Sequence, residues 1–130
     1  MTRLAVLGCG QRGSEILAQA SDPHWRVVLF DPDPAIAAPV QRAETISQAV
    51  GDAELIVIAV PDRLALVRKV AQVVQAACLP EAEIIILSGT HEQDALRSCA
   101  LRPMQIHGGI HADFEAAPLW RMFQKQVAIG

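Results

Sequence analysis

Residues 4–16 read LAVLGCGQRGSEI: an apolar run, a turn that contains three glycines, and the start of an amphipathic segment. The pattern predicts a buried strand, a tight turn and the opening of a helix. In the G-x-G-x-x-G turn of dinucleotide-binding proteins, the first glycine allows the turn, the second admits a pyrophosphate and the third lets helix and strand pack closely. A diphosphate would then bind the unpaired N–H groups of the helix. The candidate diphosphate-binding residues are Gly8, Cys9, Gly10, Gln11, Arg12 and Gly13.

A second predicted strand, residues 26–30, ends on an acidic residue. Asp31 follows Gly10 by 21 residues, near the spacing at which an acid accepts hydrogen bonds from an adenosine ribose. A 2′-phosphate beside this carboxylate would be repelled, so Asp31 favours NAD over NADP without excluding NADP. Arg12 is expected either to pair with a phosphate of the nucleotide or to point to solvent.

The rest of the chain alternates between apolar strand patterns and helical patterns. Residues 54–60 contain a continuous apolar run that is rich in β-branched residues, which indicates a strand buried on both faces of a parallel sheet. Asp62 is expected to cap the helix that follows. The sequence therefore predicts an α/β fold with a doubly wound, mostly parallel sheet. Further predicted helices are 14–20, a short one through Ala38, 46–50, 64–78 and 91–100; further predicted strands are 43–45, 84–87, 104–107 and 127–130.

Composition narrows the functional classes. The 130 residues are 52% hydrophobic and 19% charged, which predicts one globular domain over residues 1–130 with no second domain. A net charge of −3 gives no basic surface for nucleic acid, and no apolar run is long enough to cross a membrane. The first residues enter a strand directly, so a cytoplasmic location is expected. The three cysteines have no zinc-ligand spacing, and no metal site is predicted.

In a doubly wound sheet, ligands bind at the carboxyl ends of the strands. This rule brings the glycine turn and Asp31 together with residues 59–62 and 88–89 in one predicted crevice. His107 and His111 lie nearby in the sequence, on either side of two glycines. The glycines make a helix unfavourable there, so the histidines need not share a face. Two interpretations stay open: one histidine acts in a substrate pocket or in proton transfer, or both are ordinary loop residues.

Three segments together resemble a known family. VLGCGQRG (residues 6–13), LFD (29–31) and AELIVIAVPD (53–62) are similar to the N-terminal domain of the 6-phosphogluconate dehydrogenase-like superfamily, which includes prephenate dehydrogenases. The resemblance implies a Rossmann NAD(P)-binding fold, with Val60, Pro61 and Asp62 on the nicotinamide side. Residues 87–90 and 107–114 resemble the "S-G" and "G-G-H-P" patterns of its members. They imply that Ser88 and His111 are the catalytic, substrate-side groups, although Ala112 stands where the second pattern has proline.

The resemblance covers nearly the whole chain but not the helical C-terminal domain of these enzymes. It therefore implies an NAD-dependent oxidoreductase that acts on an unknown small, polar molecule, with a second copy or a partner subunit completing the site. Two alternatives stay open. One is a non-catalytic, NAD(H)-binding regulatory module, and the other is an S-adenosylmethionine-dependent methyltransferase, which also uses a glycine turn and an acid after its second strand.

Overall fold

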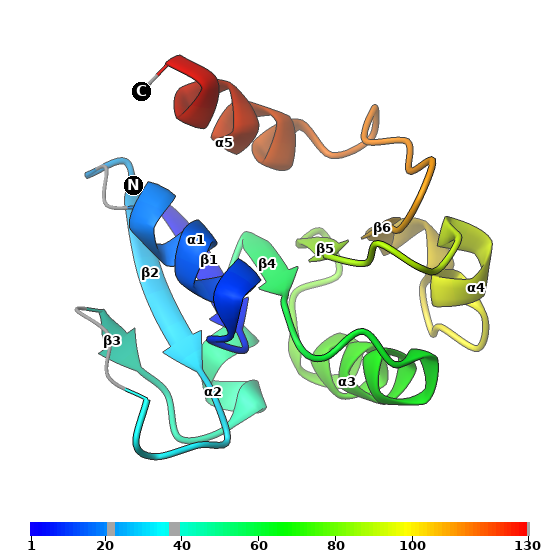
Figure 1. Cartoon of the computed structure of the whole chain (residues 1–130), viewed down its shortest axis with the longest axis horizontal. Coiled ribbons are helices and arrows are strands. Elements are labelled where there is room, and N and C mark those ends of the chain that lie inside the picture. Colours follow the sequence, from blue (N-terminus) through cyan, green and yellow to red (C-terminus); the bar gives the residue numbers. More distant parts are fainter. Residues whose placement is uncertain (21–22, 37–39, 130) are drawn as a thin grey trace.

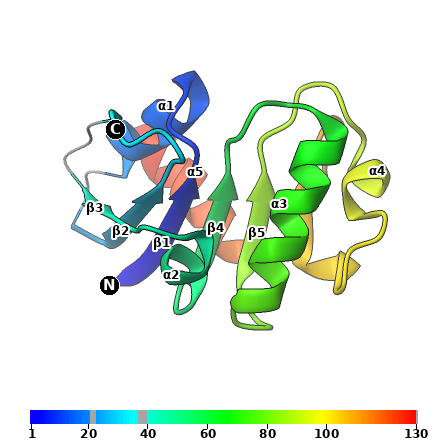
Figure 2. The same cartoon turned by 90° about the horizontal axis from the view of Figure 1, so that it is seen from below.

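The computed structural model describes residues 1–20, 23–36 and 40–129. At the centre of this described part is a sheet of six parallel strands in the order β3-β2-β1-β4-β5-β6 (Figures 1 and 2). This is the strand order of doubly wound dinucleotide-binding sheets, so the predicted fold class is confirmed. The strands are β1 (Thr2–Leu7), β2 (Trp25–Phe30), β3 (Gln41–Arg42), β4 (Leu55–Ile58), β5 (Glu83–Ile86) and β6 (Ile106–Gly108). The helices are α1 (Gln11–Gln19), α2 (Ile46–Val50), α3 (Leu64–Ala77), α4 (Gln93–Arg97), a 3-10 turn (Pro103–Gln105) and α5 (Pro118–Ile129).

The central strands are apolar on both faces because helices cover both faces of the sheet. All four residues of β4 are 1% exposed or less, as the continuous apolar run predicted. Helices α2 and α3 cover one face, and α1 and α5 cover the other (Figure 2). On the second face, Trp25 packs edge-on against Phe123 with ring centroids 5.3 Å apart, and Trp120 stacks on the same ring. Trp25 is therefore part of the packing between the sheet and α5.

The strand predicted at the C-terminus is wrong. Residues 127–129 belong to α5, and Gly130 lies outside the described residues. The helix forms because Trp120 and Phe123 lie at helical spacing and pack on the sheet. Its first turn is also capped from a distance: the buried Glu83 carboxylate accepts the N–H groups of Leu119 and Trp120 at 2.8 and 3.1 Å. A carboxylate at a helix N-terminus is stabilising because it satisfies unpaired N–H groups.

Other element boundaries also differ from the prediction. The short edge strand is Gln41–Arg42 rather than residues 43–45, and the helix predicted over 91–100 is limited to α4. The short helix predicted through Ala38 does not form over residues 31–36, while residues 37–39 lie outside the described part. The connection from β2 toward β3 is therefore a loop as far as Ile36, and this loop lines a cleft at the carboxyl ends of the strands.

Candidate functional site

A cleft of 670 Å³ lies at the carboxyl ends of β1, β2 and β4. Its lining comes from the glycine turn, the loop that follows β2 and the end of β4, with side chains of α2 and α3. The first three segments were expected to meet, and the parallel sheet brings them together because its strands all end at the same edge. Residues 88–89, expected in the same crevice, do not line this cleft, and neither does Asp62. The lining residues include Gly8, Cys9, Gly10, Gln11, Arg12, Asp31, Asp33, Ile36, Val60 and Pro61.

The three glycines of the turn differ in what surrounds them. Gly8 has a φ of +98°, and a Cβ there would lie 2.6 Å from the carbonyl oxygen of Ala59. At Gly13, a Cβ would lie 2.0 Å from the carbonyl oxygen of Gly8, so α1 packs directly on the turn. Gly10 is different, because no described atom lies within 4 Å of the position of its missing Cβ. The fold therefore needs Gly8 and Gly13, whereas the space at Gly10 is open on the cleft side.

Asp31 is fixed at the cleft by two backbone groups. Its Oδ2 accepts the N–H of Cys9 at 2.7 Å, and its Oδ1 accepts the N–H of Asp33 at 2.8 Å. The first bond joins the end of β2 to the glycine turn, although the two are 22 residues apart. The carboxylate thus lies beside the turn, where the sequence placed a ribose acceptor.

Arg12 contacts the ends of two neighbouring strands. Its Nη1 donates to the carbonyl oxygen of Leu87 at 2.7 Å, and its Nη2 lies 3.9 Å from a carboxylate oxygen of Asp62. The side chain therefore reaches across from the glycine turn to the ends of β4 and β5. About half of the side chain remains exposed to solvent, with a relative exposure of 47%.

Asp62 does not cap α3, contrary to the prediction, because Arg63 occupies the N-cap position. Its carboxylate instead accepts the hydroxyls of Ser88 and Thr90 at 2.8 and 2.9 Å and the N–H of Gly89 at 3.0 Å. Burial raises the pKa of Asp62, but these hydrogen bonds and the nearby His91 outweigh that effect and leave the pKa below its usual value. Asp62 therefore joins the loops after β4 and β5 as a carboxylate.

Ser88 and His111 lie in neighbouring segments but have different partners. Ser88 donates its hydroxyl proton to Asp62 and accepts the N–H of His91 at 3.1 Å. His111 is largely exposed, has a φ of +57°, and places Nδ1 3.3 Å from a carboxylate oxygen of Glu92. A positive φ in a residue with a side chain is uncommon and costs free energy, so it often marks a functional position.

Sequence reasoning missed why two glycines separate His107 from His111. Gly108 and Gly109 have φ values of +141° and +86°, and a Cβ on either would meet a backbone oxygen of Ile86 or His91. The pair lets residues 109–111 pack against the start of the loop before α4, where Ile110 bridges to Glu92. His91 also lies beside Asp62, with its Nε2 3.5 Å from a carboxylate oxygen, and this contact between distant residues leaves no local sequence signal.

His107 is a buried neutral histidine rather than an exposed loop residue. It is 3% exposed, and its Nδ1 has no hydrogen-bond partner among the described residues. Burial and the nearby Arg97 lower its pKa below the usual 6.5, and Asp113 only partly opposes this. The unfolded chain therefore binds a proton at a higher pH than the folded chain does.

We expect this difference to make the protein less stable in weak acid. The contribution of His107 to stability is complete above pH 6.5 and is lost as the pH falls from 6.5 through its lowered folded pKa. Thermal unfolding followed by circular dichroism from pH 8 to 5 should show this decline, and His107→Gln should reduce its slope. An equal slope in wild type and variant would contradict the assignment.

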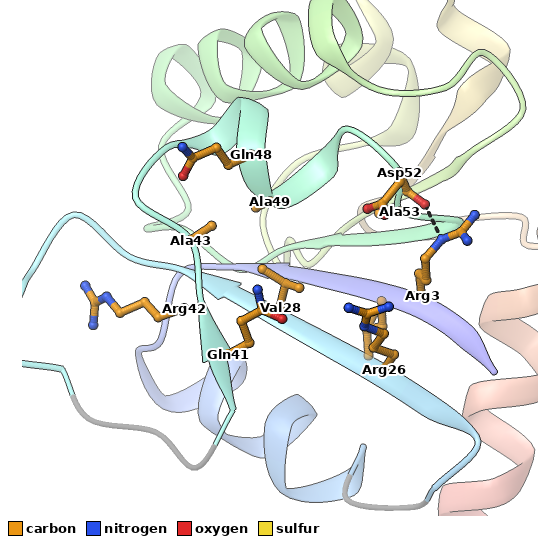
Figure 3. Close-up of a pocket in the computed structure, with 11 residues that line it drawn as sticks. Arg3, Arg26, Val28, Gln41, Arg42, Ala43, Gln48, Ala49, Asp52 and Ala53 are labelled. Carbon is orange, nitrogen blue, oxygen red and sulfur yellow. Dashed lines mark hydrogen bonds between the residues drawn. The ribbon is translucent and has the colours of Figure 1, made fainter.

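A second cavity, of 280 Å³, lies on the α2 side of β1–β3 and is lined by three arginines (Figure 3). Arg3 is bound to the carbonyl oxygen of Asp52 and lies 3.7 Å from the Glu54 carboxylate. Arg42 extends away from Gln41 and Val28, toward the loop after β2 (Figure 3). Two of the three arginines are therefore engaged elsewhere, and this cavity is a weaker candidate for ligand binding than the cleft.

Among the described residues, no group of three or more His, Cys, Asp or Glu side chains is placed to hold a metal ion. None of the helices in the same part of the chain is long and apolar enough to span a bilayer.

Comparisons with known proteins identify the fold. No family model matches the chain, and no curated protein sequence matches it. Among solved structures, (S)-3-hydroxybutyryl-CoA dehydrogenase from Ralstonia eutropha is 11% identical, with a TM-score of 0.82 over 98% of this chain and 61% of the other. An NAD⁺-dependent dismutase, 5-formyl-3-hydroxy-2-methylpyridine 4-carboxylic acid 5-dehydrogenase, is 16% identical, with a TM-score of 0.82 over 98% and 55%.

Prephenate dehydrogenase from A. aeolicus, solved with hydroxyphenyl propionate and NAD⁺, is 10% identical, with a TM-score of 0.76 over 98% of this chain and 57% of the other. The chain thus spans about half the length of the structures it matches. Identities this low establish shared architecture rather than shared activity. The chain has a Rossmann fold, which it shares with these dehydrogenases.

Proposed function

We propose that this chain binds NAD in the cleft at the glycine turn and serves as the cofactor domain of an oxidoreductase. The observation that carries the proposal is the geometry at Gly10, where the backbone is open to the cleft while Gly8 and Gly13 are closed by packing. α1 begins at Gln11, and no described side chain caps it. Its first N–H groups are therefore available to a diphosphate.

Within this proposal, each segment of the cleft has one task. The glycine turn binds the diphosphate through the backbone N–H groups of residues 10–13, because those of Gly8 and Cys9 already donate to Phe30 and Asp31. Asp31 accepts hydrogen bonds from the adenosine ribose. Val60, Pro61 and Asp62 flank the nicotinamide side. NAD is preferred because Asp31 and Asp33 both line the cleft, and two carboxylates oppose a 2′-phosphate. NADP is the weaker candidate.

In this proposal, His111 and Ser88 are the side chains that act on the substrate. Oxidation of an alcohol sends a hydride from carbon to the nicotinamide and the hydroxyl proton to a base. His111 can accept that proton on Nε2 when its Nδ1 donates to Glu92, which then stabilises the protonated ring. Ser88 already donates to Asp62, so it acts on a substrate only as an acceptor or after that bond breaks. The proposed substrate is a small polar molecule.

His111 and Glu92 are exposed, with side-chain exposures of 85% and 57%. Hydride transfer requires a site from which water is excluded. We therefore propose that a second copy or a partner subunit covers this surface during catalysis. The same exposure favours the second candidate function, a non-catalytic NAD(H)-binding module that regulates a partner. His111→Ala leaves NAD binding unchanged in both candidate functions. It abolishes hydride transfer if the protein is an oxidoreductase, whereas the regulatory module has no hydride transfer to lose.

Calorimetric titration with NAD⁺, NADH, NADP⁺ and NADPH tests the binding proposal. We expect Asp31→Asn to weaken NAD⁺ binding about ten-fold, the effect of losing one hydrogen bond to a charged group. Asp94→Asn, the same charge change on the exposed surface of α4, is the matched control and should bind as the wild type does. Equal affinities for Asp31→Asn and wild type would refute the ribose assignment.

A further inference from the structure

One side chain from the next strand donates hydrogen bonds to three carbonyl groups of the loop after β2. Residues 31–36 form no helix, yet Asp31, Asp33 and Ile36 line the cleft, so their backbone must be held in place by other contacts. Arg42, in β3, supplies them. Its Nη2 donates to the carbonyl oxygens of Asp31 and Asp33 at 2.6 and 2.5 Å, and its Nη1 donates to that of Ile36 at 2.5 Å.

The register of the sheet explains why Arg42 faces this loop. Gln41 pairs with Val28 and Arg42 pairs with Leu29, so the two residues of β3 point to opposite faces. Both residues line the second cavity, but the guanidinium of Arg42 extends away from Gln41 and donates to the loop after β2 (Figure 3). A guanidinium carries five N–H donors in a rigid plane, so one side chain can hold three carbonyl groups at once.

The same loop carries the Asp31 carboxylate, which in the proposed function accepts hydrogen bonds from the adenosine ribose. Asp31 is therefore held twice, by its carbonyl oxygen on Arg42 and by its carboxylate on the N–H groups of Cys9 and Asp33. We propose that Arg42 is a positioning residue that fixes the Asp31 carboxylate for an unphosphorylated adenosine ribose. This inference rests on the proposed function, because it specifies how that same site gains affinity for NAD. Arg42 does not itself line the cleft.

The experiment compares two variants. Arg42→Met keeps an unbranched side chain but has no hydrogen-bond donors, and Arg42→Lys keeps the positive charge but lacks the planar N–H groups of the guanidinium. We expect Arg42→Met to weaken NAD⁺ binding about ten-fold by calorimetry, and Arg42→Lys to restore only part of the loss. Arg26→Met is the matched control: it removes the same charge from an exposed position in β2 that lies outside the cleft. It should bind NAD⁺ as the wild type does.

A double-mutant cycle then shows whether Arg42 acts through Asp31. If it does, Asp31→Asn combined with Arg42→Met binds NAD⁺ no more weakly than Asp31→Asn alone. Additive losses would overturn the inference, because they would show that Arg42 contributes independently of the carboxylate. Affinity equal to wild type in Arg42→Met would overturn it as well.

Amide hydrogen exchange without nucleotide separates this inference from the proposed function. Arg42→Met should accelerate exchange at the amides of Cys9 and Asp33, which donate to the Asp31 carboxylate, while leaving central strand amides protected. Unchanged exchange at both amides overturns the positioning role alone. Failure of the wild-type protein to bind NAD⁺ overturns the proposed function and, with it, the effect on affinity. If Arg42→Met does not fold, Arg42→Lys gives the same two readouts with smaller expected changes.

Discussion

Replacing Gly10 with valine should abolish NAD⁺ binding and leave the thermal unfolding midpoint unchanged. The fold tolerates the substitution because no described atom lies within 4 Å of the new Cβ, and the backbone there is extended. The added side chain fills the space that a diphosphate needs in order to reach the backbone N–H groups. We expect a loss of at least about 100-fold in affinity, or about 2.7 kcal/mol.

Calorimetry and differential scanning fluorimetry on the same sample measure both effects. Gly89→Val is the control, because Gly89 also has open space around its missing Cβ but does not line the cleft. It should retain both NAD⁺ affinity and stability. Wild-type affinity in Gly10→Val would show that the nucleotide does not approach the glycine turn.

Replacing Gly13 with alanine should have the opposite signature, a large loss of stability. Its Cβ would lie 2.0 Å from the carbonyl oxygen of Gly8, a backbone atom that cannot rotate away. α1 must then move off the turn and lose part of the packing of Ile16 and Leu17 against the sheet. Overpacking of this kind costs about 1–3 kcal/mol and more where the backbone has to shift.

Urea unfolding followed by tryptophan fluorescence measures this loss. Gln19→Ala, on the exposed side of the same helix, should unfold at nearly the wild-type urea concentration. The account of helix packing is wrong if Gly13→Ala unfolds at that same concentration. Together, the glycine substitutions separate the residue that the ligand needs from the residue that the fold needs.

The parts of this structure that local patterns determine were predicted from the sequence. The glycine turn, the acid after β2 and the β-branched run of β4 each carry their signal within a few residues, and the parallel sheet then brings them to one edge. The strand order and the meeting of these segments at the cleft follow from general rules of α/β topology.

The parts that were missed depend on contacts between distant residues. Asp62 looked like a helix cap, but its partners Ser88–Thr90 come 26–28 residues later. Gln75, a polar residue of α3, is buried and accepts the N–H of Leu101 from outside the helix. The helix at residues 118–129 is stabilised in part by Glu83, a residue of β5 that caps its first turn. Such pairings have no local signature.

Mapping of amide chemical shifts upon NAD⁺ addition tests the central claim most directly. With ¹⁵N-labelled protein, we expect saturable shifts at residues 8–13, at Asp31 and at residues 60–62, with small changes in α4 and at the second cavity. That result would place the nucleotide in the cleft at the glycine turn. Absence of shifts, or shifts confined to another surface, would contradict the claim that this Rossmann fold binds NAD.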